Sequence, residues 1–442
     1  MNEDRKYAFM IAAPRSNSGK TLITLGLIRS LRNKGYAIQA YKCGPDYIDP
    51  MHHKMVSGRA SYNLDTWMDS PYQVKNTFIN HLLNADIGIA EGVMGFFDGA
   101  EKDSCSSAEI ARLLDLPVVL IVDASSMAYS VAPLLYGFKN FDPGVKLAGV
   151  IFNKTGSESH VHILEEGAKD AGVEVLGYVP RDSRLTIESR HLGLHLPGEN
   201  QDHKIVDAAA ELVEKHINLN SLLDICRITI AQKREKAHKQ VASPLKFAIA
   251  YDKAFNFTYQ ANLDALSELG ETTFFSPLQD TCVPDADLIW LPGGYPELFA
   301  KELSANQSMI KSIKAFIENG NTLISECGGM MYLGNTITDK NGDNYTMAGV
   351  YNFSATFKNM KLHLGYREIP LTGFSVRGHE FHYSELTGKY EKSIISYAKT
   401  ALGMPVNMPV FRYKNCWASY MHLYLGNKQK MSDFLNYMSY GK

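Results

Sequence analysis

The sequence of 442 residues has no strong excess of charge of one sign, no paired cysteines and no long apolar runs. Its 45 basic residues nearly balance 47 acidic ones, so nothing in the composition attracts nucleic acid or an anionic membrane. Its six cysteines form no C-x-x-C pair, which argues against a zinc ribbon or a disulfide scaffold and fits a reducing compartment. No apolar run approaches the roughly 18 residues of a membrane span and no signal peptide is visible, so a cytoplasmic protein is expected.

The composition is that of a globular protein, with 45% apolar and 21% charged residues. At roughly 150 residues per domain, two or three domains are expected. Short apolar runs alternate with longer amphipathic ones, as in parallel βαβ units. The polar, basic stretch AQKREKAHKQVASPLK at 231–246 breaks this alternation and is interpreted as a partly helical linker. The prediction is therefore two α/β domains, at 1–235 and 246–442, joined by a linker at 236–245.

The clearest predicted helix covers 21–34 and is closed by Gly35, which suits the position just past a helix end. The apolar runs predict strands in both halves of the chain. In the first half these strands are 7–12, 37–41, 87–90, 118–122, 147–152 and 173–178. In the second half they are 246–251, 272–275, 287–291, 322–325, 350–357, 377–384, 410–413 and 417–420.

A phosphate-binding loop is the strongest motif of the first half. The segment APRSNSGKT at 13–21 follows the first predicted strand and precedes the helix at 21–34, as a P-loop requires. Its backbone N–H groups can surround phosphate oxygens, Lys20 adds positive charge, and the Thr21 hydroxyl can reach Mg²⁺. Pro14 and Asn17 stand where glycines would be comfortable, although asparagine tolerates positive φ. A chance Gly-Lys-Thr is the alternative. The residues predicted to bind the nucleotide are Ser16, Asn17, Ser18, Gly19, Lys20 and Thr21.

Carboxylates follow two further predicted strands, at the edge where open α/β sheets bind ligands. Asp46 and Asp49 lie in YKCGPDYIDP at 41–50, and Glu91 opens EGVMG at 91–95. Because Mg²⁺ prefers oxygen ligands, Thr21, Asp46 and Glu91 are the predicted metal ligands, with Asp49 as a further candidate. A Pro/Asp turn is the alternative role for Asp46 and Asp49, whereas Glu91 has no obvious packing role. Weaker candidates for the nucleotide site end later strands: Asp123, Asn153 and Lys154.

A candidate nucleophile, Cys327, lies in SECGGM at 325–330, directly after a predicted strand. A sharp strand-to-helix turn exposes such a side chain, and a helix N-terminus lowers the pKa of a cysteine there. A buried, inert cysteine is the alternative. Gly293 and Gly294, in LPGGYPE at 291–297, can offer N–H groups to an oxyanion. The thiol also needs a base, and local context leaves four candidates: His363, His379, His382 and His422.

Together these motifs closely resemble those of the cobyrinate a,c-diamide synthase family. That family joins a P-loop, ATP-dependent amidoligase domain, related to dethiobiotin synthetase, to a class I glutamine amidotransferase domain. The resemblance spans nearly the whole chain, and KCGPDYIDP and RGHEFHYS are its most specific segments. The matching segments are APRSNSGKT at 13–21, YKCGPDYIDPMHH at 41–53, GRASYNLDTWM at 58–68, EGVMGFFDG at 91–99, LPGGYPE at 291–297, SECGGMMYLG at 325–334, GYR at 365–367, RGHEFHYS at 377–384 and SYMHLYLG at 419–426.

The resemblance implies roles for four catalytic residues. Cys327 would be the glutaminase nucleophile and His422 its base, while Asp46 would lie near the substrate and Glu91 near Mg²⁺. Many class I glutaminases carry a glutamate two residues after this histidine, but the position holds Tyr424 here, so the Cys–His pair lacks a third member. The implied partners are ATP, Mg²⁺, L-glutamine and a tetrapyrrole (corrinoid) polycarboxylate, without nucleic acid or membrane. A homodimer is left open.

The implied reaction is amidation of the a and c side-chain carboxylates of cobyrinate, in cobalamin biosynthesis. A free carboxylate reacts poorly with ammonia because oxide is a poor leaving group, whereas a phosphorylated carboxylate releases phosphate. Hydrolysis of glutamine at a cysteine supplies ammonia that is not yet protonated. Two alternatives stay open: an a,c-diamide synthase for hydrogenobyrinate or nickel-sirohydrochlorin, and a P-loop binding protein with an inactive glutaminase domain.

Overall fold

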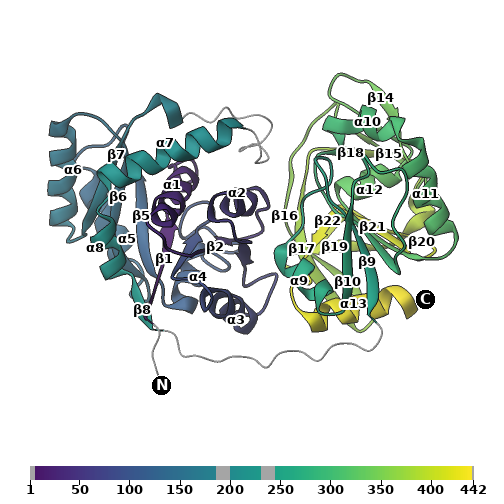
Figure 1. Cartoon of the computed structure of the whole chain (residues 1–442), viewed down its shortest axis with the longest axis horizontal. Coiled ribbons are helices and arrows are strands. Elements are labelled where there is room, and N and C mark those ends of the chain that lie inside the picture. Colours follow the sequence, from purple (N-terminus) through teal and green to yellow (C-terminus); the bar gives the residue numbers. More distant parts are fainter. Residues whose placement is uncertain (1–4, 186–199, 230–243, 441–442) are drawn as a thin grey trace. The chain divides into compact units, whose positions relative to one another are not determined.

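The computed structural model describes residues 5–185, 200–229 and 244–440. The chain divides into two compact units, Met1–Lys236 and Ala237–Lys442, which Figure 1 shows. The interpretation of 231–246 as a partly helical linker falls almost entirely outside the described residues, so the linker at 236–245 and its boundaries stay predictions. Among the described residues, no helix combines the length and hydropathy that a membrane crossing needs.

The first unit is built around a sheet whose central strand, β1 (Arg5–Ala12), leads into the phosphate loop. β1 lies between β4 (Ile87–Glu91) and β5 (Pro117–Asp123), and both pair with it in parallel. The strand order in the described residues is β3-β2-β4-β1-β5-β6-β7, and only β8 is antiparallel, pairing with the start of β1. The remaining strands are β2 (Ile38–Cys43), β3 (Tyr62–Leu64), β6 (Lys146–Thr155), β7 (Val175–Pro180) and β8 (Arg227–Thr229).

Helices cover this sheet because its central strands, β1, β4 and β5, are largely apolar and mostly buried. α1 (Lys20–Asn33) buries Ile23, Leu27 and Leu31 on one face, and each such side chain contributes about 1.5–3 kcal/mol. Gly35 has a φ of 93°, as its predicted place after the helix requires. The other helices are α2 (Ile48–Ser57), α3 (Pro71–Leu82), α4 (Ser107–Leu114), α5 (Val131–Asn140), α6 (Glu158–Asp170), the 3₁₀ turn η1 (Ser183–Leu185), α7 (Asn200–His216) and α8 (Leu219–Ile225).

The second unit combines a parallel half-sheet with an antiparallel extension. Its main sheet has the order β10-β9-β11-β12-β21-β20-β19-β16-β17-β22, parallel from β10 to β21 and antiparallel after that. A smaller sheet has the order β14-β13-β15-β18. The strands are β9 (Leu245–Ala250), β10 (Gly270–Phe275), β11 (Leu288–Leu291), β12 (Thr322–Glu326), β13 (Thr336–Thr338), β14 (Asn344–Thr346), β15 (Phe353–Thr356), β16 (His363–Leu371), β17 (Phe374–His382), β18 (Glu385–Gly388), β19 (Ile394–Thr400), β20 (Pro405–Tyr413), β21 (Cys416–Ser419) and β22 (Met421–Leu423).

The helices of this unit include the short α12, which begins directly after β12. Their bounds are α9 (Gln260–Ser267), the 3₁₀ turn η2 (Pro296–Phe299), α10 (Ala300–Ala305), α11 (Gln307–Glu318), α12 (Gly328–Leu333), the 3₁₀ turn η3 (Glu391–Ser393) and α13 (Lys428–Tyr440).

The α/β class predicted for both units is confirmed, and every predicted strand overlaps an observed one. The strands that sequence patterns missed are short or lie in the antiparallel extension. β16 is the longest of them: Gly365 and Pro370 interrupt its apolar pattern, yet it pairs with β17 over nine residues. Its pairing partner, rather than its own propensity, makes it a strand.

Candidate active sites

The loop between β1 and α1 has the backbone of a phosphate cradle. Asn17 and Gly19 have φ values of 62° and 91°, and the Ser18 hydroxyl donates to the Arg15 carbonyl at 3.0 Å. A Cβ at Gly19 would lie 2.2 Å from Nδ2 of Asn153, which itself donates to the Ser18 carbonyl at 2.9 Å. Ser16 and Asn17 are exposed. Gly19 offers no capping side chain, so N–H groups at the start of α1 are left for a ligand.

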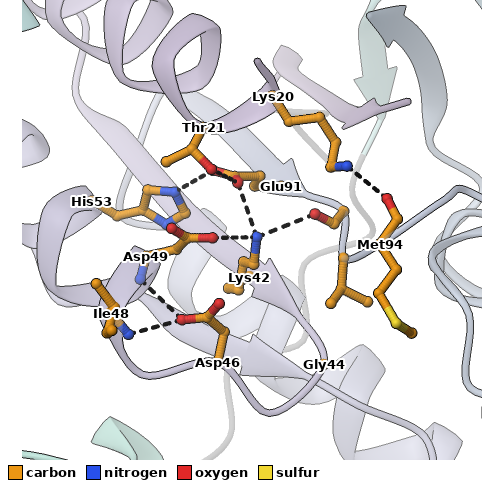
Figure 2. A network of polar contacts seen from close by, with 12 residues as sticks. Lys20, Thr21, Lys42, Gly44, Asp46, Ile48, Asp49, His53, Glu91 and Met94 are labelled. Carbon is orange, nitrogen blue, oxygen red and sulfur yellow. Dashed lines mark hydrogen bonds and ion pairs between the residues drawn. The ribbon is translucent and has the colours of Figure 1, made fainter. Parts of the chain in front are cut away.

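Lys20 links this loop to the segment that follows β4. Its Nζ donates to the Met94 carbonyl at 2.6 Å, as Figure 2 shows. It also donates to the Arg15 carbonyl at 3.3 Å. Burial, followed by the charge of Lys42, lowers the pKa of Lys20 to about 8. The ammonium therefore lies where phosphate oxygens can replace carbonyl oxygens as its acceptors.

Glu91, at the end of β4, is the centre of a buried polar network (Figure 2). Its Oε1 accepts from the Thr21 hydroxyl at 2.7 Å and from Lys42 Nζ at 2.9 Å, and its Oε2 contacts His53 Nε2 at 2.8 Å. Lys42 also lies 2.5 Å from Oδ2 of Asp49. Burial alone would raise the pKa of Glu91, but Lys42 and His53 outweigh it and hold that pKa below its usual value. Glu91 is therefore a carboxylate despite having no exposed surface.

Asp46 and Asp49 share a loop but differ in what they contact. Oδ1 of Asp46 accepts from the backbone N–H groups of Ile48 and Asp49 at 2.8 and 3.0 Å, so this carboxylate caps the start of α2. The carboxylate of Asp49 instead reaches the ammonium of Lys42. The structure thus brings Thr21 and Glu91 together, adds Asp49 to their cluster, and places Asp46 at its edge. The predicted roles of Asp46 as metal ligand and in substrate positioning stay predictions.

Sequence reasoning missed Lys42 and His53 as site residues. Both lie in YKCGPDYIDPMHH at 41–53, a segment whose aspartates alone stand out from the sequence as candidate ligands. A lysine at the end of an apolar strand was an available signal, because lysine is almost never fully buried without a charged partner. Nothing local to His53 indicated that it contacts a glutamate 38 residues further along the chain.

A cavity of about 410 Å³ lies beside the phosphate loop, at the carboxyl ends of β6 and β7. Its volume suits part of a nucleotide. Asn153 and Lys154, both candidates from the sequence, line it. Asp123 holds Lys154 through a 2.7 Å ion pair. The lining of the cavity also includes Gly19, Ser125, Pro180 and Arg181.

In the second unit, Cys327 stands alone between β12 and α12. Its φ of 41° and ψ of −103° are strained values that a nucleophile at a sharp turn commonly shows. The turn is held by the Cys327 N–H, which donates to the Ser419 carbonyl at 2.8 Å, and the thiol lies 3.6 Å from the Phe381 carbonyl. The expected lowering of the thiol pKa is wrong for this structure: burial, followed by the charge of Glu297, raises the pKa of Cys327 above its usual value. Its role as nucleophile stays a prediction.

His422 lies on β22, close to this turn. The backbone N–H of the next residue, Leu423, donates to Oε1 of Glu326 at 2.9 Å, which ties β22 to the residue before Cys327. A Cβ at Gly293 would lie 2.1 Å from Cε1 of His422, so only glycine lets LPGGYPE pack against this ring. Burial, followed by the charge of His379, lowers the pKa of His422 to about 3.

Gly294 and Tyr424 are two further residues that the sequence places near Cys327 and His422. The Gly294 nitrogen lies 3.1 Å from the position of a Cβ on Gly328, so this N–H is beside the residue after Cys327. The role of Gly293 and Gly294 as oxyanion donors stays a prediction. Tyr424 is buried edge-on against Tyr259, 5.1 Å between ring centroids.

The three rival histidines belong to the β16–β17 hairpin. His379 pairs across the strands with His422. Within the described residues, His363, Glu380 and His382 form the one cluster with ligand atoms close enough for a metal ion. However, the rings of His363 and His382 are stacked at 6°, so their in-plane lone pairs do not converge, and Glu380 is held by Arg367 at 2.6 Å. We interpret this cluster as a set of ion pairs that stabilises β17.

Two family models match the chain. The CobQ/CobB/MinD/ParA nucleotide binding domain matches residues 9–194, and the CobB/CobQ-like glutamine amidotransferase domain matches residues 246–430. Fold, sites and models together define a class of protein in which a P-loop nucleotide-binding unit is fused to a glutamine amidotransferase unit.

Relatives that match over nearly the full length narrow this class. A cobyrinate a,c-diamide synthase of Caldanaerobacter subterraneus subsp. tengcongensis is 40% identical, over 97% of this chain and 97% of its own. One of Picrophilus torridus is 39% identical, over 96% and 97%. A hydrogenobyrinate a,c-diamide synthase of Brucella anthropi is 40% identical, over 94% and 98%. The chain belongs to the cobyrinate a,c-diamide synthase family, as its motifs predicted.

The lowered pKa of His422 predicts the pH dependence of glutamine hydrolysis. A base works in its neutral form, and a folded-state pKa of about 3 keeps His422 neutral throughout the weakly acidic range. We expect kcat/KM for glutamate release to stay nearly constant from about pH 7.5 down to about pH 5, where a histidine at its ordinary pKa of about 6.5 would lose roughly tenfold or more. An acidic limb centred near that ordinary value would contradict the neutral resting pair.

Proposed function

We propose that this protein amidates the a and c side-chain carboxylates of cobyrinate, with ATP as the activating substrate and glutamine as the nitrogen source. The observation that carries the proposal is the pairing, in one chain, of the Glu91 network beside a phosphate loop with the Cys327 turn beside His422. Hydrogenobyrinate is the second candidate substrate, because relatives with that name match at 39–40% identity.

The first unit supplies the activation step. The hydroxyl of Thr21 and the carboxylates of Glu91 and Asp49 form an oxygen donor set that fits Mg²⁺. When bound there, Mg²⁺ neutralises charge on the β- and γ-phosphates. Lys20 holds the same phosphates. Lys42, between two carboxylates, adds a fixed positive charge near the oxygens on which charge develops.

The chemistry balances in two displacements. A carboxylate oxygen of the substrate attacks the γ-phosphorus, the bond to the ADP oxygen breaks, and an acyl phosphate forms. Ammonia then attacks the acyl carbon, and phosphate leaves with the former carboxylate oxygen. Asp46, at the start of α2, is proposed to position the substrate carboxylate for the first step, because a misplaced carboxylate misses the γ-phosphate.

The second unit supplies ammonia. His422 removes the proton of the Cys327 thiol as the sulfur attacks the side-chain amide carbon of glutamine. The protonated imidazole then donates its proton to the leaving nitrogen. Ammonia is released, and the glutamyl group stays on Cys327 as a thioester. Water hydrolyses the thioester to glutamate. Backbone N–H groups of Gly293 and Gly294 are proposed to stabilise the oxyanion of both steps.

We further propose that these reactions take place in the cytoplasm, with ATP, L-glutamine and a corrinoid polycarboxylate as partners and without nucleic acid or membrane. The near balance of 45 basic and 47 acidic residues supports the part of this proposal that concerns nucleic acid and membrane.

Replacing Cys327 with alanine tests the division of labour. The variant should lose glutamine-dependent amidation and glutamate release, because no thioester forms, but should keep amidation at high ammonia concentration. Product masses and glutamate release are measured with ATP and either nitrogen donor, on cobyrinate and on hydrogenobyrinate. Glutamine-dependent turnover in the variant would refute the role of Cys327. A wild-type protein that releases no glutamate would favour the inactive-glutaminase alternative.

Asp46 and Glu91 should fail in different ways. Glu91→Gln should lower the rate and change its dependence on Mg²⁺, because a ligand oxygen loses its charge. Asp46→Asn keeps a cap on α2 but removes the charge, so it should also change the ratio of mono- to diamidated product. Both products are followed over time at several Mg²⁺ concentrations, with Asp46→Ala as the variant that also loses the cap. Identical, purely rate-scaling defects would contradict the two separate roles.

A further inference from the structure

His53 lies fully buried on α2, and no step of the proposed reaction uses it. Figure 2 shows its ring directed at the carboxylate of Glu91, which Lys42 also contacts. We propose that His53 is a positioning residue: it holds Oε2 of Glu91, so that Oε1 alone is presented to the metal site beside Thr21. This inference rests on the proposed function, because it deepens the part that Glu91 plays there.

The hydrogen bonds of His53 fix which ring nitrogen carries the proton. Nε2 lies 2.8 Å from Oε2 of Glu91, and an ionised carboxylate only accepts, so Nε2 is the donor. Nδ1 lies 3.1 Å from the hydroxyl of Ser61, which can donate to it. A ring that carries a proton on Nε2 therefore satisfies the contact with Glu91, and the Ser61 hydroxyl can adapt to Nδ1. Ser61 is itself buried, so the chain Ser61–His53–Glu91 runs entirely inside the protein.

In this arrangement the two oxygens of Glu91 have different partners. Oε2 is occupied by His53, whereas Oε1 faces the Thr21 hydroxyl at 2.7 Å and Lys42 at 2.9 Å. Without His53, Oε2 would be a buried carboxylate oxygen that has lost its donor, and the group would turn to share Lys42 through both oxygens. Partners of this kind orient a metal-binding carboxylate and are typically worth about 10–100-fold in metal affinity.

α2 connects this role of His53 to the loop at 44–47, called the substrate loop here because its Asp46 is proposed to position the substrate. Asp49 and His53 are four residues apart, so they lie on the same face of the helix, and both contact the Lys42–Glu91 cluster. The start of the helix is capped by Asp46. A single helix thus places the substrate loop and the orienting histidine relative to one carboxylate, which a purely apolar core residue at position 53 would not do.

The test measures Mn²⁺ binding by the loss of its free electron paramagnetic resonance signal, on the full chain with adenylyl imidodiphosphate. His53→Leu should weaken Mn²⁺ binding about 10–100-fold. His53→Gln should stay within about threefold of the wild type, because its amide nitrogen can take the place of Nε2. His53→Asn, whose shorter amide reaches toward Ser61 rather than Glu91, should resemble His53→Leu. His52→Leu controls for losing a buried imidazole from the same helix.

The outcomes separate this inference from the proposed function. The positioning role would be overturned if His53→Leu binds Mn²⁺ as tightly as the wild type while Glu91→Gln loses Mn²⁺ affinity. The proposed metal site would still stand in that case. Wild-type affinity in Glu91→Gln would refute the metal site itself. Equal weakening in His53→Gln and His53→Asn would also overturn the inference, and this pair decides the matter if His53→Leu does not fold. Nucleotide affinity in the presence of a chelator reports whether each variant keeps the loop intact.

Discussion

A carboxylate with no exposed surface must be paired on both oxygens, and the first unit is organised around meeting this demand at Glu91. Its donors come from three different elements: Thr21 on α1, Lys42 on β2 and His53 on α2. Removing one partner of such a buried charge typically costs about 3–5 kcal/mol. The same contacts that offset the cost of burial therefore also fix the relative positions of the phosphate loop, the proposed metal ligands and the helix α2 that follows Asp46.

In the second unit, too, the candidate site residue lies at the end of a buried strand. Cys327 follows a buried parallel strand, as Glu91 does, but here the constraint is a strained turn rather than a charge. Burial raises the pKa of the thiol and lowers that of His422, so the resting pair is uncharged. Burial thus has opposite effects in the two units: in the first it forces ions to pair, and in the second it favours the neutral forms of Cys327 and His422.

Sequence patterns predicted what depends on neighbours along the chain. The central strands, α1 with Gly35 after it, the phosphate loop and the position of Glu91 at a strand end are all local in this sense. The contact between His53 and Glu91 could not be predicted, because it depends on how α2 packs against α1 and β2. The different contacts of Asp46 and Asp49 could not be predicted for a similar reason, since side-chain direction within a Pro/Asp turn is set by packing. The raised pKa of Cys327 likewise depends on burial that the sequence does not show.

Activation of a substrate carboxylate by phosphoryl transfer at the Glu91 site is the central step of the proposed reaction, and oxygen tracing tests it most directly. Cobyrinate labelled with ¹⁸O in its a and c carboxylates is converted with ATP and glutamine, and the phosphate is examined by phosphorus NMR. The account predicts that each amide formed transfers an ¹⁸O atom to phosphate, because the acyl–oxygen bond is the one that breaks. Phosphate free of ¹⁸O, formed in step with the amide, would contradict it.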